Sequence, residues 1–451
     1  MPGFFTYMRK EDKQKIWQLF LWANIGFVFY YWVLHNRGLV FASTAESMIA
    51  FGRLFGLLAA VTVLLQFFFM GRTPYLERVF GLDKLANIHH TNGKLSLVFI
   101  LLHPVLLIYG FSRLSGVSLY SQLMDFLLHY EDVAKALVGF ILFIVVVGTS
   151  IYIVRKHLKY ESWYFVHLLT YVAVGLSFGH QFSVGTDLLL SKIFYGYWVG
   201  LYVFVFGNHV FFRFGRPIYN FYKYRFEVDR VVRETHNAVS IYIKGRDLEK
   251  FKVLPGQFMI FRFLDKERWW QAHPFSLSMV KSGGEIRITP KALGDFTSAL
   301  PELKPGTKVV IDGPYGVFMS IFGAADKVLL IAGGIGITPI RSLLEELVQK
   351  GRDVILLYGN RSSKDVVFER EIAEIAERGR VKVVHVLSED KEFSGERGII
   401  DEEKIRRLVP DLGSREVYLC GPPKMMEGLL GVLYRLGVIG KRLHYERFSL
   451  T

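Results

Sequence analysis

The sequence predicts a helical membrane domain followed by two soluble domains, an antiparallel β-barrel and a parallel α/β sheet. Hydrophobic residues make up 51% of the 451 residues and aromatic residues 15%, both of which are high for a soluble protein. The long apolar runs are confined to the first half, and short alternating strands and then strand–helix alternation follow them. We therefore expect three domains, at residues 1–216, 217–322 and 323–451.

Six apolar segments are long enough to cross a bilayer as helices, which takes about 20 residues each. They lie near residues 16–35, 47–70, 88–110, 133–154, 163–182 and 188–212. The segments are too long and too uniformly apolar for the alternative of one large soluble core. The first of them follows a basic start but has no small-residue cleavage site, so we expect a span and not a cleaved signal peptide.

Basic residues gather on one side of the predicted spans, and this bias sets their orientation. The basic side is made up of Arg9, Lys10, Lys13, Lys15, Arg72, Arg78, Lys84, Arg155, Lys156, Lys159, Arg213 and Arg216. The other side carries only Arg37, Arg113 and Lys192. We therefore expect a multi-pass plasma-membrane protein whose termini and soluble half lie in the cytoplasm.

The formal net charge is +14, which nucleic-acid binding would also explain. Much of this charge flanks the apolar segments, so anionic lipid headgroups are the better explanation and no nucleic-acid partner is expected. Cys420 is the only cysteine in the sequence, which excludes an internal disulfide and a thiolate metal cluster.

Four histidines lie inside apolar segments in two pairs, His89 with His103 and His167 with His180. Polar rings in a membrane usually mark function, and neutral imidazole is an axial ligand of haem iron. The 14-residue step of the first pair places both rings on one helix face, about 21 Å apart. The 13-residue step of the second leaves its rings about 140° apart, so the fifth segment should overwind or bend. His90 could replace His89, and core or interfacial histidines are the plain alternative.

Depth assigns the pairs, because the third and fifth segments both begin on the cytoplasmic side. His89 and His167 would hold an inner haem, and His103 and His180 an outer haem. Arg53 lies about two turns inside the second segment, where a lone arginine is costly. We expect it to meet a propionate of the outer haem, with snorkelling to the outer surface as the alternative. Both axial positions of each iron would be filled, so oxygen would react at the haem edge.

The soluble half carries an ordered series of cofactor motifs. The first follows a barrel strand, and the second is a candidate helix start whose amides and Thr297 hydroxyl could hold a pyrophosphate. The third follows a strand of the α/β sheet and opens a helix, where glycines let the backbone approach phosphates, and the fourth ends a later strand at the ligand edge of that sheet. They are His273-Pro274-Phe275-Ser276-Leu277-Ser278, Gly294-Asp295-Phe296-Thr297, Gly333-Gly334-Ile335-Gly336-Ile337-Thr338-Pro339 and Cys420-Gly421-Pro422-Pro423. A small buried core residue is the plain alternative for Cys420.

Together with Gly93, four residues after His89, and Gly-Pro-Tyr-Gly at 313–316, these motifs resemble those of the ferric reductase and NADPH oxidase superfamily. The resemblance covers nearly the whole chain. It implies a six-helix haem bundle that binds two haem b groups, joined to a ferredoxin-reductase-like module that binds FAD and NADPH or NADH.

The resemblance also implies residue roles. The flavin would be contacted by His273, Pro274, Phe275, Ser276 and Ser278, with Ser276 near its reactive ring, and the FAD phosphates would be held by Gly294 and Thr297. The dinucleotide would be cradled by Gly334, Gly336, Thr338 and Pro339, with its nicotinamide near Cys420 and Gly421. The chain also matches a terminal Glu-x-Phe, whose aromatic stacks on the flavin, at Glu446 and Phe448. Arg361 and Ser362 resemble residues that receive a 2′-phosphate, which favours NADPH.

The implied function is electron transfer from NADPH through FAD and two haems to an acceptor outside, most simply O2, with Arg53 near the acceptor. A ferric chelate reductase of the same architecture is the alternative, and a transporter or proton channel with a nucleotide-sensing domain is a remote one. Leu107 stands where animal oxidases have a further histidine. The sequence has no calcium-binding loop, and it leaves the oligomeric state open.

Overall fold

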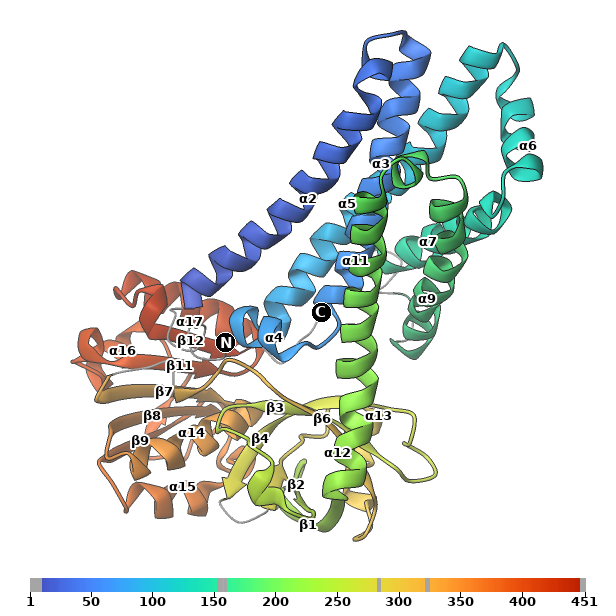
Figure 1. Ribbon diagram of the computed structural model, residues 1–451. Helices are drawn as coiled ribbons and strands as arrows, with labels where there is room; N and C mark the ends of the chain where they lie inside the picture. The colour runs from blue at the N-terminus through green and yellow to red at the C-terminus, as the bar shows by residue number, and fades with distance from the viewer. Residues whose placement is uncertain (1–9, 152–156, 158–159, 282–284, 321–324, 447–451) are drawn as a thin grey trace. The chain divides into compact units, whose positions relative to one another are not determined.

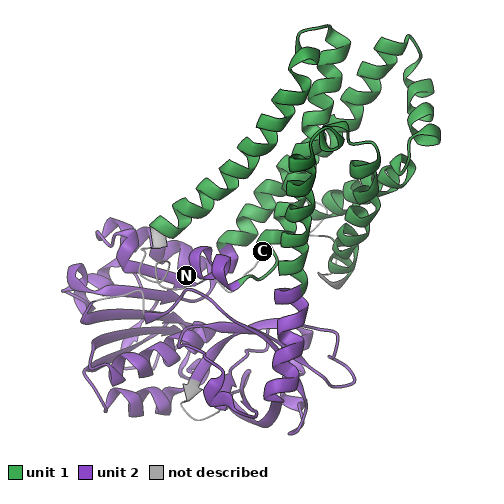
Figure 2. Ribbon diagram, in the orientation of Figure 1, with its two compact units in different colours: residues 1–73, 84–210 green, residues 74–83, 211–451 purple. Residues whose placement is uncertain are grey.

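The computed structural model describes residues 10–151, 157, 160–281, 285–320 and 325–446. They form two compact units, residues 1–73 with 84–210 and residues 74–83 with 211–451 (Figure 2). The first unit is helical, and the second contains two six-stranded sheets (Figure 1).

The helical unit contains five described helices that are long and apolar enough to cross a membrane. They include most of α2 (Lys10–Val40), α3 (Thr44–Phe69), α5 (Leu82–Ser115), α7 (Val133–Ser150) and most of α9 (Tyr160–Ser183). The sixth expected segment is the helix α11 (Lys192–Val210), which has 19 residues and is not among these five. The short helices α6 (Leu119–His129) and α10 (Thr186–Leu189) join these elements.

Helix α3 is the most buried of the five, and it packs against α2 and α11. Its first turn is capped by Ser43, whose side chain accepts a hydrogen bond from the Glu46 amide at 3.2 Å. Apolar side chains on the outer helix faces are more than half exposed, as at Leu19, Trp22 and Val203. Such faces suit contact with lipid, as expected from the apolar runs.

The second unit begins with the short helix α4 (Pro74–Phe80) and continues after the π-helical turn at Phe211–Gly215 with α12 (Arg216–Tyr224). An antiparallel sheet follows in the order β1-β2-β5-β4-β3-β6. Its strands are β1 (Glu227–Thr235), β2 (Ala238–Lys244), β3 (Phe258–Phe263), β4 (His273–Lys281), β5 (Glu285–Ile288) and β6 (Val309–Tyr315). Backbone hydrogen bonds link the start of β1 to the start of β6, as from Val309 N to Phe226 O at 3.0 Å, so the two edges of this sheet meet there.

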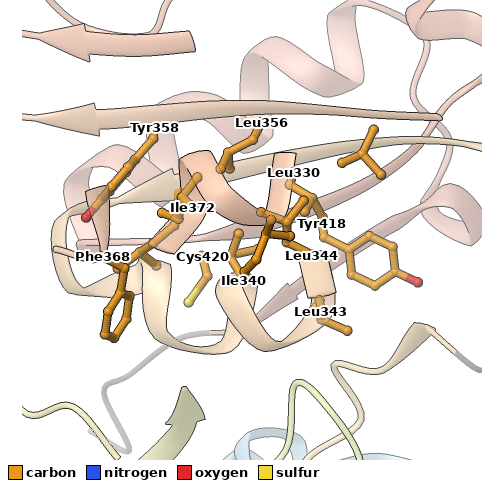
Figure 3. Packing of buried hydrophobic residues seen from close by; sticks show 14 of the residues in the cluster. Leu330, Ile340, Leu343, Leu344, Leu356, Tyr358, Phe368, Ile372, Tyr418 and Cys420 are labelled. Carbon is orange, nitrogen blue, oxygen red and sulfur yellow. The ribbon is translucent and has the colours of Figure 1, made fainter. Parts of the chain in front are cut away.

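The parallel sheet has the order β10-β9-β8-β7-β11-β12. Its strands are β7 (Lys327–Gly333), β8 (Asp353–Asn360), β9 (Val381–Leu387), β10 (Glu396–Arg397), β11 (Glu416–Cys420) and β12 (Leu443–Glu446). The helices α14 (Ile337–Gln349) and α15 (Glu369–Ala376) contribute to the core on one face, and α16 (Glu402–Leu408) and α17 (Pro423–Arg435) to the core on the other. On the first face, Ile340, Leu343 and Leu344 of α14 pack with sheet residues that include Leu330, Leu356 and Cys420 (Figure 3).

The parallel sheet that the strand–helix alternation predicts is present, and its strands β7, β8 and β11 are largely runs of buried apolar residues, as is typical of parallel strands. The short strands β10 and β12 were not predicted. The His-Pro-Phe-Ser motif was expected to follow a barrel strand; it comes after β3 in the chain, and residues 273–281 themselves form a further strand, β4, which was not predicted. Pro274 is tolerated as the second residue of that strand, where few ladder bonds are lost.

Candidate redox cofactor sites

The four membrane histidines meet in two pairs across α5 and α9. The ring centres of His89 and His167 are 6.1 Å apart, and those of His103 and His180 are 6.3 Å apart. Two imidazoles that bind one metal from opposite sides have ring centres about 6 Å apart, because each metal–nitrogen bond is about 2 Å. Both pairs therefore have the spacing that a bis-histidine haem iron requires.

Neighbouring groups orient two of these rings. His103 Nδ1 lies 2.8 Å from the carbonyl oxygen of Gly52, which fixes the tautomer with a proton on Nδ1 and leaves Nε2 for a metal. His167 Nδ1 lies 3.3 Å from the Ser150 hydroxyl. Gly56 makes room for the first ring, since a Cβ there would come within 2.6 Å of His103. These contacts are the supporting shell that a ligating histidine normally has.

His90, the alternative ligand to His89, is exposed, whereas the ring of His89 faces that of His167. This geometry favours His89 as the ligand. The fifth segment was expected to overwind or bend between His167 and His180; α9 is one continuous α-helix from Tyr160 to Ser183, and overwinding or bending within it stays a prediction. Side-chain torsions and gentle curvature can bring both rings of α9 to their partners without a break. The described residues contain no group of three or more His, Cys, Asp or Glu side chains that could hold a bare metal ion.

Arg53 belongs to a buried polar cluster in the helical unit. Its Nη1 donates to Asn36 Oδ1 at 3.3 Å, and Asn36 Nδ2 donates to Asp187 Oδ1 at 2.7 Å. His35 Nδ1 lies 3.4 Å from the same carboxylate oxygen. Asn36 and Asp187 are both buried, so the charge of Arg53 has an internal partner besides any propionate. The sequence signal for Asn36 and Asp187 is their position as polar residues at the ends of apolar segments.

The two flavin motifs of the antiparallel sheet come together. The ring of His273 on β4 stacks on Phe296 of the Gly-Asp-Phe-Thr motif, with ring centres 3.8 Å apart. Phe275 stacks more distantly on the same ring, at 6.4 Å. Ser276 is buried on β4, and Pro274 is exposed. Two motifs that begin 21 positions apart in the chain thus form one surface, which suits a single ligand.

Two hydroxyls of these motifs are already engaged within the protein. Thr297 Oγ1 accepts hydrogen bonds from the amides of Leu293 and Gly294, at 2.9 and 3.2 Å, and so caps its own short helix α13 (Asp295–Ser298). Ser278 Oγ accepts from Arg287 Nε at 3.0 Å and lies 2.8 Å from the Thr289 hydroxyl. Both side chains therefore mainly hold the shape of the site, because their hydroxyls already take part in hydrogen bonds within the protein.

The dinucleotide motif lies where β7 passes into α14. Gly336 is packed so closely against the Cys420 carbonyl that a Cβ at residue 336 would overlap it. Gly334 has a φ of +50° and open space around it, and Thr338 and Pro339 are buried at the start of α14. The loops after β7 and β11 thus touch through glycine, and the backbone at Gly334 stays open for a phosphate.

Cys420 and Glu446 end the neighbouring strands β11 and β12 and are in-register partners. Gly421, the next residue after Cys420, is also buried. The Glu446 carboxyl is buried with Oε2 lacking a hydrogen-bond partner among the described residues, and burial raises the pKa of both Cys420 and Glu446. Phe448, the expected stacking aromatic, lies outside the described residues.

Glu77 of α4 is a site residue that the sequence did not suggest. It is buried, and its Oε1 accepts a hydrogen bond from Gly316 N at 2.7 Å. A Cβ on Gly316 would in turn lie 3.3 Å from Glu446 Oε1. The second unit therefore brings two carboxyl groups to the Gly-Pro-Tyr-Gly motif at the end of β6. A residue in the loop between two membrane spans gives no sequence signal for such a role.

Arg361 and Ser362 follow β8 at the carboxyl edge of the parallel sheet, the edge that also carries Gly334 and Cys420. This is the edge at which open α/β sheets bind nucleotides. Arg361 is exposed, and Ser362 is half-buried.

Three family models match consecutive parts of the chain. Residues 55–178 match a ferric reductase like transmembrane component, residues 223–319 an FAD-binding domain and residues 330–430 an oxidoreductase NAD-binding domain. The first match contains His89, His103 and His167 and ends two residues before His180. The other two contain the motifs of the antiparallel and the parallel sheet.

Curated relatives resemble the soluble half. The glycine betaine monooxygenase reductase subunit of Pseudomonas aeruginosa is 29% identical over 231 residues, 49% of this chain and 63% of its own. An NADPH oxidoreductase of Mycobacterium tuberculosis is 29% identical over 52% of this chain and 62% of its own. Flavohemoprotein A of Dictyostelium discoideum is 26% identical over 50% and 60%. This chain thus spans less than two thirds of the length of these three relatives.

Among solved structures, the ferredoxin reductase in carbazole 1,9a-dioxygenase is 25% identical, with a TM-score of 0.45, over 50% of this chain and 68% of that one. The three matched domains, in this order, match an architecture of the ferric reductase and NADPH oxidase type, a ferric-reductase-like membrane component followed by an FAD-binding and an NAD-binding oxidoreductase domain.

Proposed function

We propose that this protein moves electrons from a cytoplasmic nicotinamide dinucleotide, through FAD and two bis-histidine haems, to an acceptor on the far side of the plasma membrane. The donor would be NADPH or NADH, with its adenosine ribose near Arg361 and Ser362. We further propose six spans, with α11 as the sixth, and domains at 1–216, 217–322 and 323–451. Both termini and the two sheets would lie in the cytoplasm, as the basic residues indicate.

The spacing of the two histidine pairs is the observation that carries this proposal. Ring separations of 6.1 and 6.3 Å suit one iron between each pair, and they occur on two helices of the matched ferric-reductase-like segment. The remote alternative, a proton relay, would require hydrogen bonds that link the two rings of each pair. The ring separations do not favour such bonds over a shared iron. The neighbouring FAD-binding and NAD-binding matches supply the electron source that two haems need.

The residues of this chain would hold and orient the cofactors, which supply the redox chemistry themselves when bound. His89 and His167 would hold the inner haem, and His103 and His180 the outer haem. The Gly52 carbonyl would keep the ligating nitrogen of His103 deprotonated by holding the proton on Nδ1. The surface formed by His273, Ser276 and Phe296 would position the flavin.

The acceptor we favour is O2, reduced to superoxide or peroxide. His103 and His180 would together hold the outer haem, which would supply the electron for O2 when bound. Arg53, held by Asn36, would attract an anionic product or acceptor there. Leu107 packs beside Gly52 in place of the histidine of animal oxidases, so a ferric chelate remains the second candidate acceptor.

The test uses purified full-length protein in sealed liposomes. We expect a reduced-minus-oxidised spectrum of low-spin haem, about two haems per FAD, and haem reduction by NADPH or NADH without air. A protein without haem would overturn the proposal and favour a transporter. In air, superoxide release supports O2 as acceptor, whereas anaerobic reduction of a membrane-impermeant ferric chelate with no superoxide in air supports the metal reductase.

A further inference from the structure

The end of β8 and the end of β9 lie together at the carboxyl edge of the parallel sheet, because these strands are neighbours in register. Arg361 follows β8, and Glu389 follows β9 by two residues. Their backbones are joined by a hydrogen bond from Glu389 N to Arg361 O at 2.8 Å. The residues expected to meet the adenosine ribose of a dinucleotide are therefore flanked by the Ser-Glu-Asp sequence at 388–390.

The positive charge of Arg361 already has a negative neighbour. Arg361 Nε lies 3.8 Å from Glu389 Oε1, and the two side chains are 78% and 66% exposed. An exposed ion pair of this length is weak, so Glu389 does not lock Arg361 in place. The negative charge of Glu389 does reduce the attraction of Arg361 for a 2′-phosphate.

The serine donors beside Arg361 are also engaged by carboxylates. Ser362 Oγ donates to Asp365 Oδ2 at 2.9 Å. The Ser363 amide and hydroxyl both donate to Asp390 Oδ2, at 3.3 and 2.9 Å. These two bonds lower the pKa of the Asp390 carboxyl, which therefore stays ionised at neutral pH. The serine donors that a 2′-phosphate would need are therefore already hydrogen-bonded to carboxylates.

We propose that this chain uses NADH in preference to NADPH, and that Glu389 and Asp390 set the preference. The inference rests on the proposed function, in which a nicotinamide dinucleotide reduces the flavin, and it replaces NADPH with NADH as the preferred donor. In nucleotide-binding α/β sheets an acidic side chain accepts a hydrogen bond from the ribose 2′-hydroxyl of NADH, whereas an arginine accommodates the 2′-phosphate of NADPH. A 2′-phosphate carries a charge of about −1.5 to −2 and would meet Glu389 and Asp390 beside a single exposed arginine.

The experiment measures kcat/KM for anaerobic flavin and haem reduction by NADH and by NADPH, using the full-length protein with its cofactors. The wild type is expected to favour NADH by about tenfold, the specificity that one or two misplaced charges typically provide. Glu389→Gln and Asp390→Asn should each lower this ratio at least about threefold, mainly through a lower KM for NADPH. Glu389→Arg should lower it further.

Glu374→Gln is the matched control, since Glu374 is an exposed acid of α15 that lies away from this edge. It should leave the NADH to NADPH ratio of the wild type unchanged, which separates a local effect from a change in net charge. A wild-type preference for NADPH, or a ratio that Glu389→Gln and Asp390→Asn both leave unchanged, overturns the inference. If neither dinucleotide reduces the flavin, the proposed function itself fails.

Discussion

Cys420 and Glu446 are in-register partners at the ends of two neighbouring parallel strands, and both side chains are buried. Burial raises the pKa of the Cys420 thiol, and the charge of Glu446 adds to this rise. Burial also raises the pKa of the Glu446 carboxyl, with Asp83 and Glu77 raising it further. The carboxyl edge of this sheet therefore favours two neutral, protonated groups where the dinucleotide motifs converge.

The raised pKa of Glu446 predicts a stability that falls as pH rises. The folded protein keeps the proton that the unfolded chain loses near its ordinary pKa of about 4.3, so the unfolded state binds fewer protons above that pH. The stabilisation is fully present below that value and decreases until the folded pKa is reached. Glu446→Gln carries no proton to lose, so its melting temperature relative to wild type should increase from pH 5 to pH 8.

Thermal unfolding followed by circular dichroism in detergent measures this difference. Glu403→Gln, which changes an exposed acid of α16, should show the same offset from wild type at both pH values. An offset for Glu446→Gln that is equally independent of pH would show that the carboxyl ionises normally in the folded protein.

The haem ligands predict a selective loss of cofactor. His103→Leu removes one ring of the pair that lies 6.3 Å apart, so the outer haem should be lost while the inner one stays, and haem content should fall from about two to about one per FAD. His90→Leu, an exposed neighbour of His89, should keep both haems. The pyridine haemochrome spectrum gives the content, and an unchanged value for His103→Leu would refute this ligand pair.

The sequence predicts those helices and strands that are determined by neighbouring residues in the chain. The apolar runs predict the spans, and continuous buried strands such as Val328–Ile331 predict the parallel sheet, because one periodic signal decides each. The histidine pairs could be chosen for the same reason, since rings inside apolar helices are costly.

The contacts that complete the sites depend on tertiary structure. The bond between Asn36 and Asp187 joins residues 151 positions apart, and that between Glu77 and Gly316 joins residues 239 positions apart. Neither follows from spacing or composition. The free or engaged state of a hydroxyl, as at Thr297, is likewise decided by its neighbours in the fold.

The close approach of Gly336 to Cys420 predicts a severe effect of a single methyl group. Gly336→Ala would overlap a backbone carbonyl, which cannot move as a side-chain end can, so we expect a loss of at least about 1–3 kcal/mol in the free energy of unfolding. Reduction of the flavin by a dinucleotide should fall with it, because the loop after β7 must shift. Urea unfolding and anaerobic flavin reduction measure the two effects.

Gly428→Ala is the matched control in the same domain. Gly428 lies in α17 with no atom within 4 Å of an added Cβ, and alanine in a helix is favoured by up to about 1 kcal/mol. This variant should be as stable as wild type or more so. Equal behaviour of the two variants would mean that the contact between the loops is not tight.

Glu371 joins the two sheets of the second unit through two buried arginines. It accepts from Arg287 of β5, at 3.0 Å and 3.1 Å, and pairs with Arg341 of α14. Both guanidinium groups are buried, whereas the Glu371 side chain is 26% exposed. Removing the carboxylate leaves Arg287 without an anionic partner among the described residues and Arg341 with Glu345 alone, so Glu371→Ala should cost about 3 kcal/mol, the lower end for a broken buried pair.

Because Arg287 belongs to the antiparallel sheet and Glu371 to the parallel one, this loss should also uncouple their unfolding. Urea denaturation followed by flavin fluorescence and by circular dichroism should give coincident transitions for wild type and separate transitions for Glu371→Ala. Glu374→Ala, an exposed position on the same helix, should stay within about 0.5 kcal/mol of wild type. Coincident transitions and an unchanged midpoint in Glu371→Ala would mean that apolar packing alone joins the two sheets.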